Sequence, residues 1–436
     1  MKKFAIKPLI GALLTGVFLS FSACQLDNIP NPNAPDQVNL ENGGATLNDL
    51  RLLASGLEAV LRVDMEFHFW TTSIVGRDYW DLRNTDPRYT GELLGKGGGD
   101  LDDNGFLTTR SYAGRYRAAR SAWVTIHATQ NSTASLTQAQ RNGFIGHART
   151  LLGYSLLMEV NRQYQNGIRT DVEDPDNRGG YETYDVALRS IRAILDQANT
   201  ELDGAELLFT STLGDVVRIK QFNRALAARV EMYKGGSTAP AAMRPLLQET
   251  WMDADGDMNE GVYYVFGAGG NNRLNPLYNV PGQTQYAAHP DFVANAEPDD
   301  TRFSSKTTQL ATPFATDGLS GDVQVTMLSS NTAPFPIIRN EELVLMWAEA
   351  NIGFDNNEAI AAINKVRAAA GLGAYGGPTD DASVINQLLH ERRYSLFGEG
   401  HRWIDMRRFG RINEIPTDRP DDKVHTQFPR PVLDPE

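Results

Sequence analysis

The sequence is poor in cysteine and short of positive charge. A single cysteine among 436 residues cannot form an internal disulfide, and it excludes a cysteine-rich zinc or iron–sulfur site. The 54 acidic side chains outnumber the 41 basic ones, which gives a formal net charge of −13. Because nucleic acids bind basic surfaces, this balance argues against a nucleic acid as the main partner.

Motifs for metal binding and catalysis are also scarce. The seven histidines form no H-x-H or H-E-x-x-H pair, and no G-x-S-x-G motif occurs. The acids are too numerous for the sequence to single out a glycosidase pair. Residues 371–376 match G-x-G-x-x-G, but a helical pattern precedes them where a dinucleotide site needs a strand. We interpret Gly371 as a helix-ending glycine.

One acidic run has the spacing of a calcium loop. Asp253, Asp255 and Asp257 alternate as in the first half of an EF-hand, where carboxylates converge on a hard cation. Met258 stands at the position of the usual glycine and Tyr264 at that of the usual glutamate, which argues against an EF-hand. A looser structural calcium site and a solvated acidic turn are the two remaining interpretations.

The sequence has a single long apolar run, at its N-terminus. Residues 9–23 follow three lysines and are too few to span a bilayer, which is typical of a signal peptide. Small residues directly precede Cys24, as in the bacterial lipobox, although Phe21 stands where leucine is usual. We predict a lipoprotein signal peptide at 1–23, a membrane-anchoring lipid on Cys24, and a flexible tether over 24–45. Ordinary secretion with an incidental cysteine is the alternative.

Helical periodicity dominates the rest of the sequence. Apolar residues recur at three and four positions from Leu47 to Leu61, and Thr137 with Gln140 fits a capping box before another helix. Further helices are predicted at about 111–130, 182–203, 217–235, 339–353, 357–370 and 382–398. They fall into adjacent pairs with small-residue faces, which is typical of helix-pair solenoids, although no strict tetratricopeptide period is present.

Two stretches interrupt the helices. Residues 66–110 and 236–336 are rich in aromatic residues, glycine, proline or asparagine, and long irregular segments of this kind are usually functional loops. Short strands are predicted there at 262–266 and 323–328. We expect a mainly α fold in one domain over 46–436. Its helical scaffold should cover about 46–65, 111–235 and 337–410.

The most specific pattern lies at residues 391–408. The runs Glu-Arg-Arg, Glu-Gly-His-Arg-Trp and Asp-Met-Arg-Arg resemble the hallmark of the SusD/RagB family, with Ser395 in place of a glutamate. Other motifs of that family are resembled, in order, by segments 225–230, 338–351, 362–372 and 428–431. We expect the hallmark to be structural, with partly buried ion pairs and a tryptophan in the core. Its residues are Arg392, Glu399, Gly400, Arg402, Trp403, Asp405 and Arg408.

The resemblance implies a fold and a function. The fold would be a SusD-like α-α superhelix of tetratricopeptide-like helix pairs, packed against an irregular part. The protein would be a non-catalytic lipoprotein, lipid-anchored at the outer-membrane surface, as in Bacteroidetes-type glycan utilisation. It would bind a nutrient, most often an oligosaccharide, and deliver it to a SusC-like TonB-dependent barrel without a cofactor. The alternatives are a docking subunit with a non-glycan ligand and a secreted carbohydrate-active enzyme.

Aromatic side chains in the two irregular stretches are the candidate ligand contacts. Aromatic rings cover the apolar faces of sugars, while nearby polar groups bind the hydroxyls. We favour Arg77 and Asp78 as polar contacts and Trp80 as the aromatic one. The full set of candidates is Trp70, Arg77, Asp78, Tyr79, Trp80, Tyr89, Trp251, Tyr263, Tyr264, Tyr278 and Tyr286. The alternative is that these residues only pack the loops.

Overall fold

The computed structural model describes residues 37–174, 177–270, 272–432 and 434. The predicted signal peptide, Cys24 and the first part of the tether lie outside the described residues. Among the helices that are described, none is both long and apolar enough to cross a membrane.

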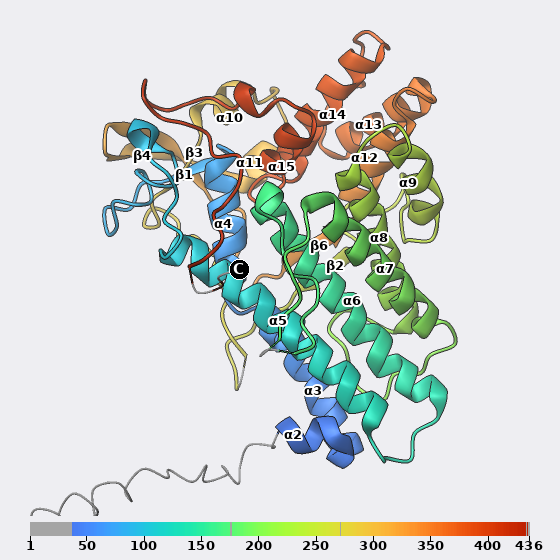
Figure 1. The fold of residues 1–436 in the computed structure, drawn as a ribbon. Helices are drawn as coiled ribbons and strands as arrows, with labels where there is room; N and C mark the ends of the chain where they lie inside the picture. The colour runs from blue at the N-terminus through green and yellow to red at the C-terminus, as the bar shows by residue number, and fades with distance from the viewer. Residues whose placement is uncertain (1–36, 175–176, 271, 433, 435–436) are drawn as a thin grey trace, which may run out of the picture.

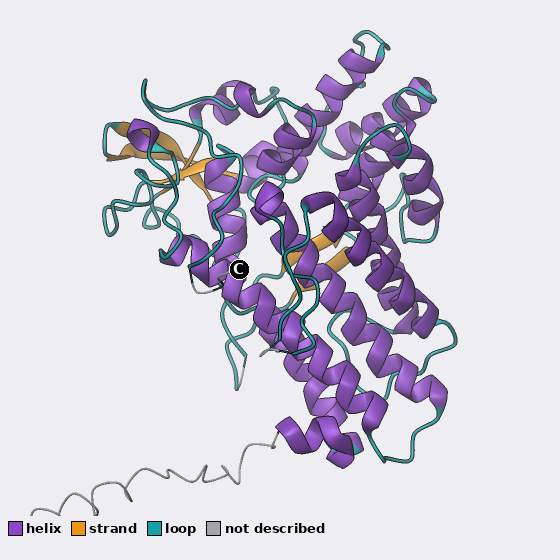
Figure 2. Cartoon of the chain, in the orientation of Figure 1, coloured by secondary structure: helices purple, strands orange, loops and turns teal. Residues whose placement is uncertain are grey.

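Helices form most of the molecule and stack side by side (Figures 1 and 2). The long scaffold helices are α3 (Leu47–Leu61), α5 (Phe106–Asn131), α6 (Gln138–Gln163), α7 (Tyr184–Leu202), α8 (Val216–Lys234), α12 (Asn340–Asn351), α13 (Asn356–Ala369) and α14 (Asp381–Ser395). Neighbours along the chain pack together: α5 on α6, α6 on α7, α7 on α8, and α12 on α13 and α14. This succession confirms the predicted helix-pair scaffold.

Local sequence signals set several helix boundaries. Thr137 exchanges hydrogen bonds with Gln140 at the start of α6, as predicted, and Thr46 does the same with Asp49 at the start of α3. After α13, Gly371 takes a φ of +80°, which favours glycine. The G-x-G-x-x-G run therefore follows a helix end, not a strand, and lacks the context of a dinucleotide site.

Two small antiparallel sheets complete the fold (Figure 2). The first has the order β1-β3-β5-β4, and its strands are β1 (Tyr79–Asp81), β3 (Tyr286–Ala288), β4 (Thr307–Thr316) and β5 (Leu319–Val325). The second pairs β2 (Gly261–Tyr264) with β6 (Phe335–Arg339). Strands β2 and β5 overlap the two predicted strands. In the first sheet Trp80 lies opposite Ala287, so β1 and β3 join the two stretches that were predicted as loops.

The main departure from the predicted fold is α4 (Met65–Val75), which lies in a stretch predicted as a loop. Every residue from Phe67 to Val75 is buried. A helix buried on all sides has no polar face, so its sequence lacks the periodicity that reveals amphipathic helices. Residues 236–336 are likewise more regular than predicted, since they also contain α9 (Ala239–Gln248), α10 (Pro290–Ala294) and α11 (Thr301–Lys306).

The end of the predicted tether takes part in the fold. Helix α2 (Gln37–Asn39) leads into a π-helical turn (Leu40–Gly44). Leu40 and Ala45 are buried in a small apolar cluster with Phe144 of α6.

Candidate functional site

Three aromatic rings converge on the guanidinium of Arg83. Helix α4 supplies Trp70, β3 supplies Tyr286, and the segment after β1 supplies Arg83 and Tyr89. The Cζ atom of Arg83 lies 5.5 Å from the ring centroid of Trp70, 4.8 Å from that of Tyr89 and 5.0 Å from that of Tyr286. With Asp81 of β1, these four residues form what we call the Arg83 cluster. The structure thus brings together three of the predicted ligand contacts.

Asp81 holds the guanidinium in place. The Nε and Nη2 atoms of Arg83 donate to the Asp81 carboxylate at 2.9 and 2.7 Å. Burial raises the pKa of Asp81, although Arg83 acts against that shift. The Arg83 side chain is 34% exposed, and its Nη1 atom has no partner among the described residues. Since Tyr89 and Tyr286 are also half-buried, the cluster retains ring surface and free N–H donors for a ligand.

The three residues that we favoured lie deeper. Arg77 and Asp78 are fully buried and Trp80 is 5% exposed. The Nε atom of Arg77 pairs with Asp418 at 2.7 Å, and the indole N–H of Trp80 donates to the same carboxylate at 2.7 Å. Asp78 accepts the backbone N–H of Gly398 at 3.2 Å. Their burial and internal partners fit the alternative that these residues pack the fold.

Asp418 is the centre of that buried group. It also pairs with His289, whose Nε2 atom lies 2.9 Å from the carboxylate. Burial opposes the charged form, but His289 and Arg77 outweigh it and lower the pKa of Asp418 below its usual value. Asp418 therefore ties β1, through Trp80, to the C-terminal segment, and this anchors the strand that carries Asp81.

The remaining aromatic candidates do not contact the guanidinium of Arg83. Tyr79 is buried and stacks on Tyr286 at 5.5 Å. Trp251 is buried and donates to the backbone of residue 260, and Tyr264 is buried with its hydroxyl 2.8 Å from that of Tyr154. Tyr263 and Tyr278 are half-buried. Tyr263 lines a pocket of 360 Å³ between β2, α11 and the hallmark.

The calcium interpretation of the acidic run is not supported. Asp253 and Asp257 each accept a backbone N–H two residues ahead, at 2.9 Å, and Asp255 pairs with Lys365. The three carboxylates do not form a group of close oxygens within the described part of the chain. The geometry is that of a solvated acidic turn, because the backbone satisfies the oxygens that a cation would need.

The hallmark forms a buried ion-pair network around Asp405, which lies in α15 (Arg402–Arg408). The Nε and Nη2 atoms of Arg392 donate to the Asp405 carboxylate at 2.7 and 3.1 Å, and the Nε of Arg408 donates to it at 2.9 Å. Arg408 in turn pairs with Glu349 of α12. Burial opposes the charge of Asp405, but the two arginines outweigh it and lower the pKa to about 2. The network therefore ties α14 and α15 to α12.

Other hallmark residues complete the scaffold role. Glu399 accepts from Arg339 at 2.5 Å, and the fully buried Trp403 donates its indole N–H to the backbone of His425 at 2.7 Å. Gly400 has a φ of +77°, and a Cβ atom there would lie 2.5 Å from a side chain of α4. Glycine is required at this position for both reasons.

Comparison with known proteins agrees with this architecture. Residues 247–430 match the family model described as the SusD family. The chain is similar to a SusD superfamily protein from Bacteroides vulgatus ATCC 8482, with a TM-score of 0.69 and 16% identity over 88% of this chain and 96% of that one. Residues 247–430 of the chain are thus similar to the SusD family, and the chain as a whole shares the fold of these solved proteins.

Two further solved structures share the fold. B. fragilis NanU matches with a TM-score of 0.66 and 17% identity, over 89% of this chain and 94% of its own. Surface glycan-binding protein A from Bacteroides thetaiotaomicron, solved in complex with laminarihexaose, matches with a TM-score of 0.66 and 14% identity, over 85% of this chain and 92% of its own. A search of curated proteins gave no match.

One residue of the hallmark segment departs from the expected pairing. Arg402 forms no ion pair within the described residues, and its neighbour Arg393 is the residue that pairs with Asp291, at 2.7 Å. Burial and the charge of Arg393 lower the pKa of Arg402 to about 10. The prediction of an ion pair at Arg402 was therefore wrong.

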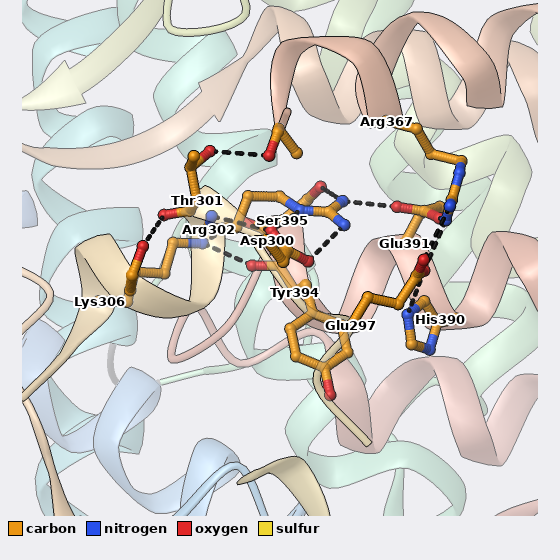
Figure 3. A network of polar contacts seen from close by, with 12 residues as sticks. Glu297, Asp300, Thr301, Arg302, Lys306, Arg367, His390, Glu391, Tyr394 and Ser395 are labelled. Atoms are coloured by element: carbon orange, nitrogen blue, oxygen red, sulfur yellow. Dashed lines mark hydrogen bonds and ion pairs between the residues drawn. The ribbon is translucent and has the colours of Figure 1, made fainter. Parts of the chain in front are cut away.

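Ser395, which replaces the family's glutamate, sits in a second polar network (Figure 3). Its hydroxyl accepts from Arg302 at 3.1 Å, and Arg302 also pairs with Asp300 and Glu391. Lys306 donates to the backbone carbonyls of residues 394 and 395 at 2.7 and 2.5 Å. Burial lowers the pKa of Lys306 to about 8. Two other acids therefore hold Arg302, whereas the SusD/RagB pattern places a further glutamate at the position of Ser395.

The same network contains a group of possible metal ligands. Glu297, His390 and Glu391 place one ligand atom each within 4.8 Å of one another. Arg367, however, donates to Glu297 at 2.6 and 2.8 Å and to Glu391 at 2.6 Å (Figure 3). Because guanidinium groups already neutralise both carboxylates, the arrangement fits a structural ion-pair network.

Sequence reasoning missed the central residue of the candidate site. Arg83 follows Asp81 by two residues, and this Asp-x-Arg spacing within an aromatic-rich segment was the available signal. Its role became visible only when Tyr286, more than two hundred positions away in the sequence, was placed beside it by the pairing of β1 with β3.

Proposed function

We propose that this protein is a non-catalytic, cell-surface lipoprotein that binds oligosaccharide and delivers it to a SusC-like TonB-dependent outer-membrane barrel. The observation that carries the proposal is the Arg83 cluster. Tyr89 and Tyr286 are half-buried rings beside a guanidinium whose Nη1 atom is free among the described residues. Aromatic faces bind the apolar side of a pyranose, and a fixed N–H donor selects hydroxyl groups.

Preorganisation favours binding at this cluster. Asp81 holds Arg83 through two hydrogen bonds, and Asp418 anchors the strand to which Asp81 belongs. A ligand therefore meets side chains that are already ordered, which reduces the entropy lost on binding. The laminarihexaose bound by a protein of the same fold supports an oligosaccharide as the ligand class.

The test is affinity electrophoresis of residues 25–436 against a panel of neutral polysaccharides. We expect retardation by at least one of them, and about a tenfold weaker interaction for Arg83→Lys and Tyr89→Leu. Arg83→Lys keeps the charge that pairs with Asp81 but removes the Nη1 donors. Tyr375→Leu is a matched control, since Tyr375 is a half-buried tyrosine in the loop after α13, outside the cluster. Equal retardation of all variants would refute the site.

The same experiment separates the alternatives. A docking subunit with a non-glycan ligand would show no retardation by any polysaccharide but would still co-purify with a barrel. A carbohydrate-active enzyme would release new reducing ends, and a single acid-to-amide variant would abolish them. Retardation without product release agrees with a binding protein alone.

The proposed anchor rests on the sequence around Cys24. We expect that Cys24→Ala, expressed in the native cell, moves the protein from the membrane fraction to the soluble fraction, because no other acyl acceptor of this type exists in the chain. Fractionation followed by immunoblotting measures the shift. As a control, Ser22→Thr changes the same segment without removing the thiol. A Cys24→Ala protein that stayed with the membrane would contradict lipid attachment at this residue.

A further inference from the structure

An arginine-rich pocket lies between the first half of α5, residues 169–172 with Arg178, and the C-terminal end of the described chain, which passes beside α5 (Figure 1). Its volume is 490 Å³. Phe67 links it to the Arg83 cluster: the Phe67 ring contacts Trp70 edge to face at 5.5 Å, and the guanidinium of Arg110 lies 4.3 Å from the same ring. We call this hollow the α5 pocket.

The charge of the α5 pocket is opposite to that of the whole chain. Five arginines line it, against three aspartates, so the lining carries an excess of two positive charges in a protein of net charge −13. The arginines are Arg110, Arg117, Arg120, Arg169 and Arg178. Such a local inversion of sign attracts anions and raises their concentration at the site.

The aspartates of the pocket neutralise only part of this charge. Arg110 pairs with Asp64 at 2.6 Å, and Asp434 is shared between Arg178, at 2.5 Å, and Arg169, at 3.3 Å. Each of these carboxylates is thus already engaged with a guanidinium. These ion pairs fix the orientation of the guanidinium groups, so an added anion would meet N–H donors that are already oriented.

Two arginines keep capacity for a ligand. Arg117 is exposed and makes no hydrogen bond or ion pair within the described part of the chain. Arg120 donates to backbone carbonyls of residues 172 and 173, and its guanidinium lies 3.5 Å from Glu41. Its side chain is 25% exposed, so it is oriented by the protein while remaining accessible.

The wall of the pocket is aromatic. The rings of Tyr112 and Tyr116 lie 4.5 Å apart at 38°, and both line the pocket. Their hydroxyls are bound within the protein, that of Tyr112 to Asp434 and that of Tyr116 to the backbone of Arg169 at 2.9 Å. Tyr112 is only 6% exposed and Tyr116 is half-buried, so the ring surface left for the apolar face of a sugar is mainly that of Tyr116.

We propose that the α5 pocket binds a carboxylate-bearing sugar, a uronate unit, of the ligand. Planar guanidinium groups match a carboxylate in a bidentate way, and the tyrosine wall covers the pyranose ring to which the carboxylate is attached. The inference rests on the proposed function for the saccharide nature of the ligand. It adds that the ligand is acidic and that a second site, distinct from the Arg83 cluster, selects its charge.

Isothermal titration of residues 25–436 with trigalacturonate, and with maltotriose as the neutral probe, tests the proposal. We expect trigalacturonate to bind the parent protein. It should bind Arg117→Gln about tenfold more weakly, because that variant loses one charge-assisted contact. Raising salt from about 20 to about 500 mM should weaken it further. Arg189→Gln is the matched control, because Arg189 is an exposed arginine on α7, outside the pocket.

The outcomes separate this inference from the proposed function. If neutral glycans bind but trigalacturonate does not, the pocket assignment fails while the glycan-binding function stands. If Arg83→Lys weakens trigalacturonate binding and Arg117→Gln does not, the acidic sugar binds at the Arg83 cluster and the inference is overturned. If inorganic phosphate competed with trigalacturonate as well as a uronate does, the pocket would be a general anion site. If trigalacturonate bound only to a protein truncated after Asp434, the chain's own C-terminus would be the natural occupant of the pocket. Both results would overturn it.

Discussion

Replacing Asp405 by alanine is expected to lower the free energy of unfolding by about 3–5 kcal/mol. The carboxylate is 3% exposed and accepts from both Arg392 and Arg408. Its removal leaves the fully buried Arg392 guanidinium without its acid, and an unpaired buried charge is among the largest single penalties in a folded protein. Urea unfolding monitored by circular dichroism measures the change.

A surface pair provides the control. Glu414 pairs with Arg411 three residues earlier, and both side chains are exposed to solvent by 30% or more. Exposed pairs contribute little, so Glu414→Ala should change the free energy of unfolding by less than about 1 kcal/mol. If Asp405→Ala had an effect as small as this, the hallmark could not be the structural centre that joins α14 and α15 to α12.

The parts of the fold that were predictable have local causes. The capping boxes at Thr46 and Thr137 satisfy backbone N–H groups within three residues, so the sequence at those sites determines the helix start. Helix α7 was predictable because its apolar residues recur at three- and four-residue spacing on one face, at Ala187, Leu188, Ile191 and Leu195. Helix α4 was missed because burial on every side removes that periodicity.

The candidate site was predictable only in part, since composition does not reveal burial. Trp80 and Tyr89 look alike as aromatic residues of one irregular segment. Strand pairing buries Trp80 against Asp418, whereas Tyr89 stays half-exposed beside Arg83. The α5 pocket was invisible for a related reason: its arginines are spread from 110 to 178 and meet only after α5 and the C-terminal end pack together.

Two of the buried histidines, His401 and His425, make a defined contribution to the expected response to acid. Between pH 7 and pH 5, His401 and His425 together should remove about 4 kcal/mol of stability. Burial lowers the pKa of each to about 4 in the folded protein, with Arg229 and Arg392 opposing protonation of His401. An unfolded histidine titrates near pH 6.5, so the unfolded chain takes up these protons first. The contribution is complete above pH 6.5 and is lost as the pH falls to 4.

Asp78 acts in the opposite direction and must be separated from this effect. Burial raises its pKa to about 6, so the folded protein takes up this proton before the unfolded chain does and gains stability as the pH falls below 6. The net change in the parent protein is therefore smaller than the histidine contribution alone. Only a comparison between variants isolates the imidazoles.

The measurement is urea unfolding at pH 7 and pH 5 for the parent, His401→Gln, His425→Gln and His127→Gln. Each buried-histidine variant should reduce the difference between the two pH values by about 2 kcal/mol, because glutamine does not titrate. His127→Gln is the control for replacing an exposed histidine, because the His127 side chain is 36% exposed, and the two buried-histidine variants should reduce the difference by more. An equal loss of stability in all four proteins would mean that groups other than these two imidazoles govern acid unfolding. Agreement would show that the neutral imidazole of His425, whose backbone carbonyl accepts from Trp403 of the hallmark, stabilises the fold.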